Sequence, residues 1–211
     1  MLLATMMLKL FTFAMIPALV SSSTCVGTSK DLIDHDCAMM QAWVDHPAYH
    51  DRVTSICPTV RSDPCNCTFD RPVDCDGGRV RQLRLGKQGL EGPFPEMLIN
   101  LTGLVWFDMA ANNITGTIPE AITQLTDLGF LALGTNKLTG TIPAAMANMP
   151  LLHDLGIDTN PLLGGHLPPF NFSAFTSCCA LYNVPFECPL PSGADKCNHC
   201  NYHPVDAPSC N

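Results

Sequence analysis

The sequence predicts an α/β solenoid, a coil of stacked repeat units, closed at each end by a disulfide-bonded cap. Two observations lead to this prediction. Apolar residues recur every 128 − 104 = 24 residues through the middle of the chain, so that Leu104 matches Leu128 and Leu128 matches Leu152. A fixed period of this length is typical of a stacked repeat protein. The 12 cysteines of the 211-residue chain all lie outside that region, six before it and six after it. This placement predicts crosslinks at the two ends of the coil.

The repeat is clearest over residues 104–151, where a shift by one period superimposes eight positions of one unit on the next. In the second unit these positions are Leu104, Phe107, Met109, Asn112, Ile114, Gly116, Ile118 and Pro119. The register extends backward to Val80 and forward to Gly164, after which one inserted residue delays the last pair to Leu167 and Pro168. Alternation within LxLxx predicts a short strand whose leucines point inward. Each unit depends on its neighbours to bury its apolar face.

The shared pattern, LxxLxLxxNxLxGxIP, resembles the plant-type leucine-rich repeat of receptor-kinase ectodomains and polygalacturonase-inhibiting proteins. The resemblance implies a right-handed leucine-rich repeat superhelix with a parallel β-sheet on its concave face. It also implies that one polar side chain in each unit binds backbone groups of the neighbouring turn. This ladder comprises Gln88, Asn112, Asn136 and Asn160, and tight bends follow at Gly92, Gly116, Gly140 and Gly164.

The chain divides into a leader, a cap, the repeats and a second cap. Residues 1–23 are predicted to form a secretory signal peptide, in which Lys9 precedes an apolar run too short to span a bilayer. An N-terminal cysteine-rich helical cap covers residues 24–79. Four repeats follow at 80–103, 104–127, 128–151 and 152–170. A degenerate repeat and a cysteine-rich C-terminal cap cover residues 171–211.

The charge of the chain limits its partners. The formal net charge is −8, and cleavage of the signal peptide removes only Lys9, which leaves 10 − 19 = −9. An acidic balance argues against nucleic acid or an anionic membrane as the partner. We expect a secreted, extracellular monomer with no cofactor and no membrane insertion after signal cleavage.

The even number of cysteines at each end predicts disulfides rather than free thiols. The two sets are Cys25, Cys37, Cys57, Cys65, Cys67 and Cys75, and Cys178, Cys179, Cys188, Cys197, Cys200 and Cys210. The resemblance implies the pairs Cys25–Cys65 and Cys67–Cys75, which leaves Cys37–Cys57. The family's cap-to-repeat junction, DPCxWxGVxCD, differs here because Cys67 replaces the usual tryptophan. Cys197, Cys200 and His203 have a spacing that could bind zinc, but an oxidising compartment favours disulfides, so no metal site is predicted.

Each cap has a predicted element of structure. A helix over residues 30–45 is expected in the N-terminal cap, where Ser29 can cap its start and Pro47 ends it. The residues expected to face the first repeat are Leu32, Ile33, Met40, Trp43 and Val44. In the C-terminal segment Cys179 and Leu181 take the strand positions of a fifth unit, and Val184 takes the ladder position.

Stacking by this period arranges the outward side chains in columns across the sheet. One column is Gln82, Trp106, Phe130 and Asp154, the next is Arg84, Asp108, Ala132 and Gly156, and a third is Lys87, Ala111, Thr135 and Thr159. Since neighbouring strands lie about 4.8 Å apart, Trp106 should contact Phe130 and Arg84 should pair with Asp108. Exposed aromatics beside arginine are typical interface anchors, although cross-strand stabilisation of the sheet is the alternative role. The predicted partner-binding residues are Arg81, Arg84, Trp106, Asp108, Phe130, Asp154 and Asp158.

Four Asn-x-Ser/Thr motifs predict N-glycosylation, at Asn66, Asn100, Asn113 and Asn171. None of them falls on an outward-facing strand position, so the concave face should be free of glycans.

These features predict a non-catalytic recognition module that binds an extracellular protein or glycan on its concave face. The nearest acidic residues on the concave face are Asp108 with Asp154 or Asp158, and their backbone positions would be about 12 Å apart across the sheet. This is wider than the roughly 5–9.5 Å between the two carboxyl groups of a glycosidase. No catalytic residues are therefore expected. Three alternatives remain: a polygalacturonase-inhibitor-like protein, a co-receptor-like signalling ectodomain, and an ice-binding or structural surface protein. The last rests on the repeated threonines Thr115, Thr117, Thr139 and Thr141.

Overall fold

The structure is a computed structural model that describes residues 34–60, 63–67, 72–175, 178–200 and 203–204. The predicted signal peptide, the start of the predicted cap helix, Cys25 and Cys210 lie outside the described residues. No helix in the described part of the chain is both long and apolar enough to cross a membrane.

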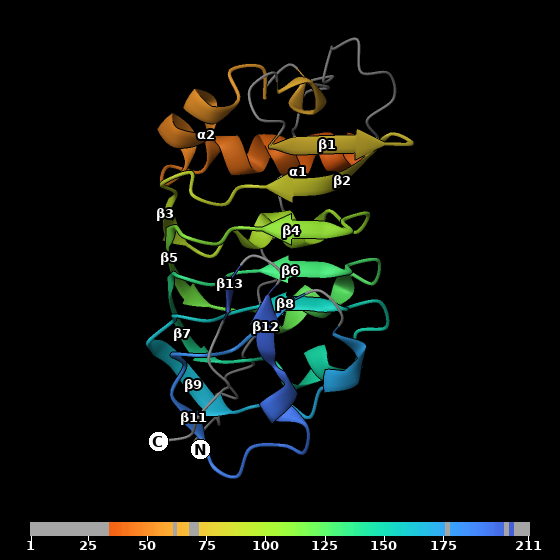
Figure 1. The fold of residues 1–211 in the computed structure, drawn as a ribbon. Helices are drawn as coiled ribbons and strands as arrows, with labels where there is room; N and C mark the ends of the chain where they lie inside the picture. The colour runs from red at the N-terminus through yellow and green to blue at the C-terminus, as the bar shows by residue number, and fades with distance from the viewer. Residues whose placement is uncertain (1–33, 61–62, 68–71, 176–177, 201–202, 205–211) are drawn as a thin grey trace, which may run out of the picture.

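The first sheet forms one face of the solenoid, with its strands stacked along the length of the molecule (Figure 1). Its strand order is β1–β2–β4–β6–β8–β10–β12–β13. The bounds are β1 Val73–Asp76, β2 Arg79–Arg84, β4 Trp106–Asp108, β6 Phe130–Ala132, β8 Asp154–Gly156, β10 Cys178–Ala180, β12 Asn198–Cys200 and β13 His203–Pro204. The strands from β2 to β10 are parallel and those outside them are antiparallel. The solenoid and its parallel sheet are therefore confirmed.

A second sheet runs alongside the first, and the sequence did not predict it. Its order is β11–β9–β7–β5–β3, with β3 Glu91–Pro93, β5 Asn113–Thr117, β7 Lys137–Thr141, β9 Leu162–His166 and β11 Phe186–Glu187. All of its pairings are parallel. The bend glycines lie inside these strands at positive φ, at 81° for Gly116 and 78° for Gly140. Glycine adopts this conformation without the steric penalty of a β-carbon.

A short 3-10 helix returns the chain from the second sheet to the first. In three successive repeats the N-cap of this helix is a proline, namely Pro95, Pro119 and Pro143. Proline restricts φ to the helical range and needs no hydrogen bond for its nitrogen, which suits the start of a helix. The helices are η1 Pro64–Asn66, η2 Glu96–Asn100, η3 Glu120–Gln124, η4 Ala144–Asn148, η5 Phe172–Ala174 and η6 Ala194–Lys196.

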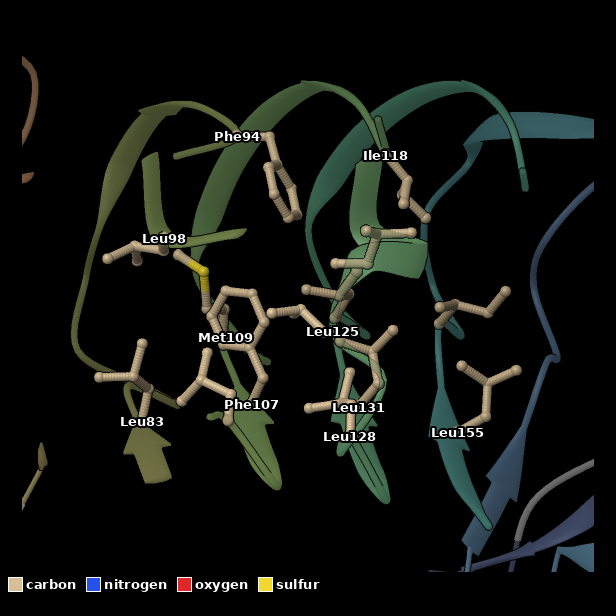
Figure 2. Packing of buried hydrophobic residues seen from close by; sticks show 14 of the residues in the cluster. Leu83, Phe94, Leu98, Phe107, Met109, Ile118, Leu125, Leu128, Leu131 and Leu155 are labelled. Carbon is tan, nitrogen blue, oxygen red and sulfur yellow. The ribbon is translucent and has the colours of Figure 1, made fainter. Parts of the chain in front are cut away.

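The core is one continuous apolar column inside the coil (Figure 2). The predicted strand leucines and their neighbours are fully buried, including Leu83, Phe107, Leu131 and Leu155. Figure 2 shows these side chains pointing inward from successive strands, so that each turn packs on the next. Stacking of neighbouring units therefore buries the apolar face, as the periodicity requires.

The asparagine ladder links successive turns by hydrogen bonds to the backbone. Asn112 Nδ2 donates to Leu85 O and Met109 O, both at 2.8 Å, and its Oδ1 accepts from Leu90 N at 2.9 Å. Asn136 and Asn160 repeat this pattern one and two turns later. Each side chain thereby satisfies polar groups that the turn would otherwise leave without partners. The role implied for these asparagines is confirmed.

The residue before each ladder position adopts a left-handed conformation. φ lies between 51° and 58° at Lys87, Ala111, Thr135, Thr159 and Asn183. Of these residue types only asparagine favours the left-handed region. The amino-acid types at these positions therefore do not predict the conformation. The backbone N–H groups of the first four donate to the next turn, for example Ala111 N to Gly134 O at 2.8 Å. Four of these strained positions therefore also form a hydrogen bond between turns. The left-handed conformation recurs at Asn183, in the fifth unit.

The inserted residue of the fourth repeat lies earlier than predicted. The alignment placed Leu162 and Gly164 in register, but Leu162 is 64% exposed whereas Leu163 is fully buried. Leu163 pairs with Gly140 just as Leu138 pairs with Gly116, and Gly165 takes the bend with φ 76°. The inserted residue lies directly after Asn160. Leu163, one residue later than the predicted Leu162, therefore takes the core position of this repeat.

The N-terminal cap contains two helices, α1 Asp34–Asp45 and α2 His50–Ile56. The predicted end of the first helix before Pro47 is confirmed, and Met40, Trp43 and Val44 are buried. The second helix was not predicted. Polar contacts fasten this cap to the first repeat: the carboxylate of Asp36 accepts from Arg79 Nε at 3.1 Å and from Val80 N at 2.9 Å.

The predicted N-terminal disulfide pairing was wrong. Cys57 bonds Cys67, with Cα atoms 5.0 Å apart, and Cys65 bonds Cys75, with Cα atoms 5.6 Å apart. Cys65 and Cys67 lie on either side of Asn66 at the η1 turn, so their side chains point to different neighbours. Buried Cys67 faces the residue that follows α2, while half-buried Cys65 faces β1. Cys37 is also disulfide-bonded.

The C-terminal segment forms the predicted fifth unit. Cys179 pairs with Leu155 in the first sheet, and Cys179, Leu181 and Val184 are buried. Cys179 bonds Cys197, which therefore does not serve as a zinc ligand. Cys188 is disulfide-bonded as well. The cap thus closes the core with crosslinks.

Candidate functional site

The first sheet carries a stacked aromatic pair near its middle. Gln82, Trp106, Phe130 and Asp154 are successive register partners across β2, β4, β6 and β8. The ring centroids of Trp106 and Phe130 lie 3.6 Å apart and the ring planes differ by 5°. The predicted contact is confirmed. Both residues are half-buried, because each ring covers one face of the other.

Two polar atoms beside this pair have no hydrogen-bond partner in the described part of the chain. They are the indole Nε1 of Trp106 and the Oε1 of Gln82, and both are buried. A buried donor or acceptor without a partner costs free energy. The two residues are neighbours across β2 and β4, so one buried donor and one buried acceptor lie without partners on the β2 side of the aromatic pair.

Glycines in the sheet make room for the acidic side chains of the next repeat. The Asp108 carboxylate lies over Gly86, where a β-carbon would come within 2.9 Å of Oδ2. The Asp158 carboxylate lies over Gly134 in the same way. The small residues of the sheet therefore seat these two carboxylates close to the backbone.

The two seated carboxylates share an electrostatic property. Burial raises the pKa of Asp108, while the Ala110 N–H at 2.9 Å and the charge of Lys87 lower it by less. Burial also raises the pKa of Asp158, against hydrogen bonds that include one from Tyr182. Removal of a carboxylate from water disfavours its charged form. Both groups retain their hydrogen bonds, so they are held in fixed positions.

The predicted pair between Arg84 and Asp108 does not form. The two residues are register neighbours, but no ion pair joins them among the described residues, and Asp108 is turned toward Ala110 and Gly86. Arg84 is exposed. Arg81 instead forms an ion pair with Asp127, at 3.2 Å. The guanidinium of Arg84 is therefore an accessible positive group at the first-repeat end of the sheet.

Asp154 is less accessible than predicted. It is only 5% exposed, and its Oδ2 lies 3.2 Å from Nδ1 of the exposed His153. The ring of His153 lies over Gly129, where a β-carbon would approach Nε2 to 2.7 Å. His153, rather than Asp154, therefore forms the accessible surface here, and the pattern of the sequence did not distinguish them.

The three acidic residues of the predicted surface have separate polar partners. Asp108, Asp154 and Asp158 are each held by separate neighbours rather than facing one another. Within the described residues no cluster of three potential metal ligands occurs.

Comparison with known proteins identifies the fold. The Leucine Rich Repeat family profile matches residues 103–125. A chain in the crystal structure of the BIR3–SERK2 complex from Arabidopsis thaliana is 25% identical, with a TM-score of 0.60, and the match covers 74% of this chain and 86% of that one. The chain carries a leucine-rich repeat motif and has a fold similar to that of plant leucine-rich repeat ectodomains.

Other plant leucine-rich repeat structures agree. The BIR2 ectodomain from Arabidopsis thaliana is 25% identical, with a TM-score of 0.59, over 78% of this chain and 87% of that one. The ectodomain of the Arabidopsis receptor kinase HAESA, in complex with an IDA peptide hormone, is 23% identical, with a TM-score of 0.63. That match covers 79% of this chain but 28% of HAESA, and it concerns the fold alone. No curated protein sequence matches the chain significantly.

Proposed function

We propose that this leucine-rich repeat protein is an extracellular, non-catalytic recognition module whose first sheet binds a protein or peptide. The observation that carries the proposal is the Trp106–Phe130 stack at the middle of an open parallel sheet. Solved relatives with this fold include the BIR3–SERK2 complex and HAESA with a bound peptide hormone. The disulfide-bonded caps fit an oxidising extracellular compartment.

The orientation of the aromatic pair favours a peptide over a sugar. A sugar ring packs on an open aromatic face, and stacking closes one face of Trp106 and one face of Phe130, which reduces the aromatic surface available to a sugar. Ring edges carry the positive end of the aromatic quadrupole, so they suit carbonyl and carboxylate oxygens.

Charge along the sheet gives the bound partner a direction. Arg84 and Lys87 are both exposed at the first-repeat end, whereas Asp158 lies at the fourth-repeat end. Complementary charges steer association and fix register more than they raise affinity. We expect the acidic part of the partner to lie over β2. Arg81 and Asp108 define the edges of this surface, and Asp154 positions His153.

The alternative role for the stack is cross-strand stabilisation of the sheet, which contributes about 0.2–1 kcal/mol per pair. This role leaves the buried indole N–H without a partner. The ice-binding alternative has less support, because the register of the second sheet pairs Thr115 with Lys137 and Thr139 with Leu162. The repeated threonines therefore do not form continuous columns.

Affinity capture from extracellular fluid tests the proposal. Wild type, Trp106→Ala, Arg84→Glu and the control Leu162→Ser would be immobilised, and the captured species identified by mass spectrometry. Leu162 is exposed on the second sheet, so its variant should capture the same protein as wild type. Trp106→Ala and Arg84→Glu should lose it.

Two results would count against the proposal. Equal capture by all four proteins would remove the first sheet as the binding surface, and capture of a polysaccharide alone would replace a peptide by a glycan. Tryptophan emission gives an independent readout, because Trp43 is buried in the N-terminal cap and a partner on the sheet should alter mainly the emission of Trp106.

A further inference from the structure

A cavity of about 130 Å³ opens between η4 and η5, and none of its lining residues belongs to either sheet. Met146, Met149 and Leu152 come from the segment that contains and follows η4, and Phe170 and Phe175 come from the segment around η5. The cavity is therefore distinct from the binding surface proposed for the first sheet.

The cavity lies where the period of the 3-10 helices is broken. η2, η3 and η4 begin at Glu96, Glu120 and Ala144, at intervals of 120 − 96 = 24 and 144 − 120 = 24 residues. η5 begins at Phe172, after 172 − 144 = 28 residues. Because a repeat of a solenoid is packed by its neighbours, the late start of η5 leaves space beside η4.

Residues at this cavity are apolar where the preceding repeat is polar. Thr126 and Asp127 of the second repeat correspond, one period later, to Pro150 and Leu151. Pro150 lines the cavity and is exposed, and Leu151 is 54% exposed. No charged residue occurs in the stretch 138–152. Exposed apolar surface beside a cavity is typical of a ligand-binding site.

The size of the cavity fits one six-membered carbon ring. Sites for drug-sized ligands measure about 300–1,000 Å³, while an engineered apolar cavity of about 150 Å³ holds benzene. At about 130 Å³, this cavity can hold one such ring. A larger ring system would have to extend through the opening.

The walls of the cavity favour an aromatic ring over an alkyl chain. Phe170 and Phe175 form a cluster with Phe172, in which ring centroids lie 5.8–6.3 Å apart. Aromatic rings attract one another edge to face at such distances, and methionine sulfur also makes favourable contacts with a ring. Met146 and Met149 supply this sulfur. An alkyl chain would gain only dispersion contacts from the same walls.

The lining also restricts the ligand to uncharged molecules. Asn171 is the one lining residue with a polar side chain, and none of the lining residues is charged. A charge that leaves water without a partner carries a large desolvation cost. We propose that this cavity binds a small, uncharged, monocyclic aromatic compound. This activity is additional to the recognition proposed for the first sheet.

Benzene is the simplest probe of this site. A ligand of six heavy atoms that reaches about half of the ceiling for very small ligands binds with a Kd on the order of 1 mM. In NMR spectra of protein labelled with carbon-13 in the methionine methyl groups, the ring current of benzene should shift Met146 and Met149 with this Kd. Met40, in α1, and Met109, which follows β4, should not shift. At about 10 mM benzene the Tm should rise by about 3–6 °C.

Filling the cavity should abolish binding. Ala147 lines it and is half-buried, so Ala147→Leu should remove the shifts that benzene causes. The matched control is Thr123→Leu, at the equivalent half-buried position one period earlier, which does not line the cavity. This control should bind benzene with the Kd of the wild type. If Ala147→Leu is not produced, Ala174→Leu provides the same test, because Ala174 lines the cavity from η5.

Two further probes test the chemical class of the ligand. n-Hexane has the same number of carbon atoms as benzene but no π-system, and it should bind about two- to tenfold more weakly. Benzoate carries a negative charge on the same ring and should cause no shift at about 10 mM.

The proposal would be overturned by unshifted Met146 and Met149, by equal shifts at Met40 and Met109, or by undiminished binding in the filled variant. Tighter binding of n-hexane would also overturn it and would indicate a site for alkyl chains, and binding of benzoate would overturn the restriction to uncharged ligands. None of the variants changes a residue of the first sheet. Failure here therefore leaves the proposed binding on that sheet untouched, and failure there leaves this site untouched.

Discussion

Replacing Asn136 by alanine removes the middle member of the asparagine ladder. Its side chain is 6% exposed. Nδ2 donates to Met109 O at 3.0 Å, Leu133 O at 2.9 Å and Gly134 O at 3.3 Å, and Oδ1 accepts from Ile114 N at 3.0 Å. The substitution therefore leaves one buried N–H and two well-bonded carbonyls without their side-chain partner.

The cost can be estimated from these contacts. A hydrogen bond contributes about 0.5–1.5 kcal/mol net, and a buried group left unsatisfied costs about 1–3 kcal/mol. The carbonyls each retain a second lone pair, so the Ile114 N–H dominates the loss. We expect Asn136→Ala to lower the free energy of unfolding by about 3–5 kcal/mol. Since a domain is stable by about 5–15 kcal/mol, the variant should still fold.

Urea unfolding followed by tryptophan fluorescence measures this loss, provided that the m-value stays constant. Asn112→Ala is the matched control, because Asn112 makes the same bonds but is half-buried. Water can replace part of its bonding, so its loss should be smaller, about 1–2 kcal/mol. Equal losses in the two variants, or a loss below about 1 kcal/mol for Asn136→Ala, would refute this account of the ladder.

Two further predictions concern the fourth-repeat insertion and the seated carboxylates. Leu163→Ala should cost about 2–5 kcal/mol of stability, whereas Leu162→Ala should change it by less than about 0.5 kcal/mol; equal effects in chemical denaturation would contradict the observed register. Asp108→Asn should raise the Tm at pH 7 and lose this advantage on acidification, as calorimetry between pH 3 and 7 would detect. Burial raises the pKa of Asp108 in the folded state, so its contribution to stability falls as the pH rises from the ordinary carboxylate value through the raised one. A difference in Tm that does not depend on pH would show that the charge is not the cause.

The predictions that succeeded from sequence are those that depend on the period alone. A constant period requires equivalent positions to stack. The contact between Trp106 and Phe130, and the column that joins Gln82 to Asp154 through them, therefore follow from the period. The period also placed the ladder asparagines in register, while their hydrogen-bonding role followed from the resemblance to the plant-type repeat. Inward leucines and outward polar residues alternate along a strand whatever the surroundings.

The predictions that failed depend on choices between adjacent residues. Leu162 and Leu163 are chemically identical, and only packing against the preceding turn decides which of them enters the core. Cys65 and Cys67 likewise differ only in the direction that the η1 turn gives their side chains. Pairing Arg84 with Asp108 assumed that register neighbours interact, whereas the backbone N–H of Ala110 is the closer partner of that carboxylate.

The sequence by itself determined the coil and the columns of side chains on the first sheet, because periodic burial of apolar residues dictates both, and the cysteines outside the repeats indicated the capped ends. The tertiary structure alone decided the second sheet, the burial of Asp154 beside His153, and the cavity between η4 and η5. These features arise where side chains from different turns compete for the same space. The outcome depends on distances that a one-dimensional pattern does not contain.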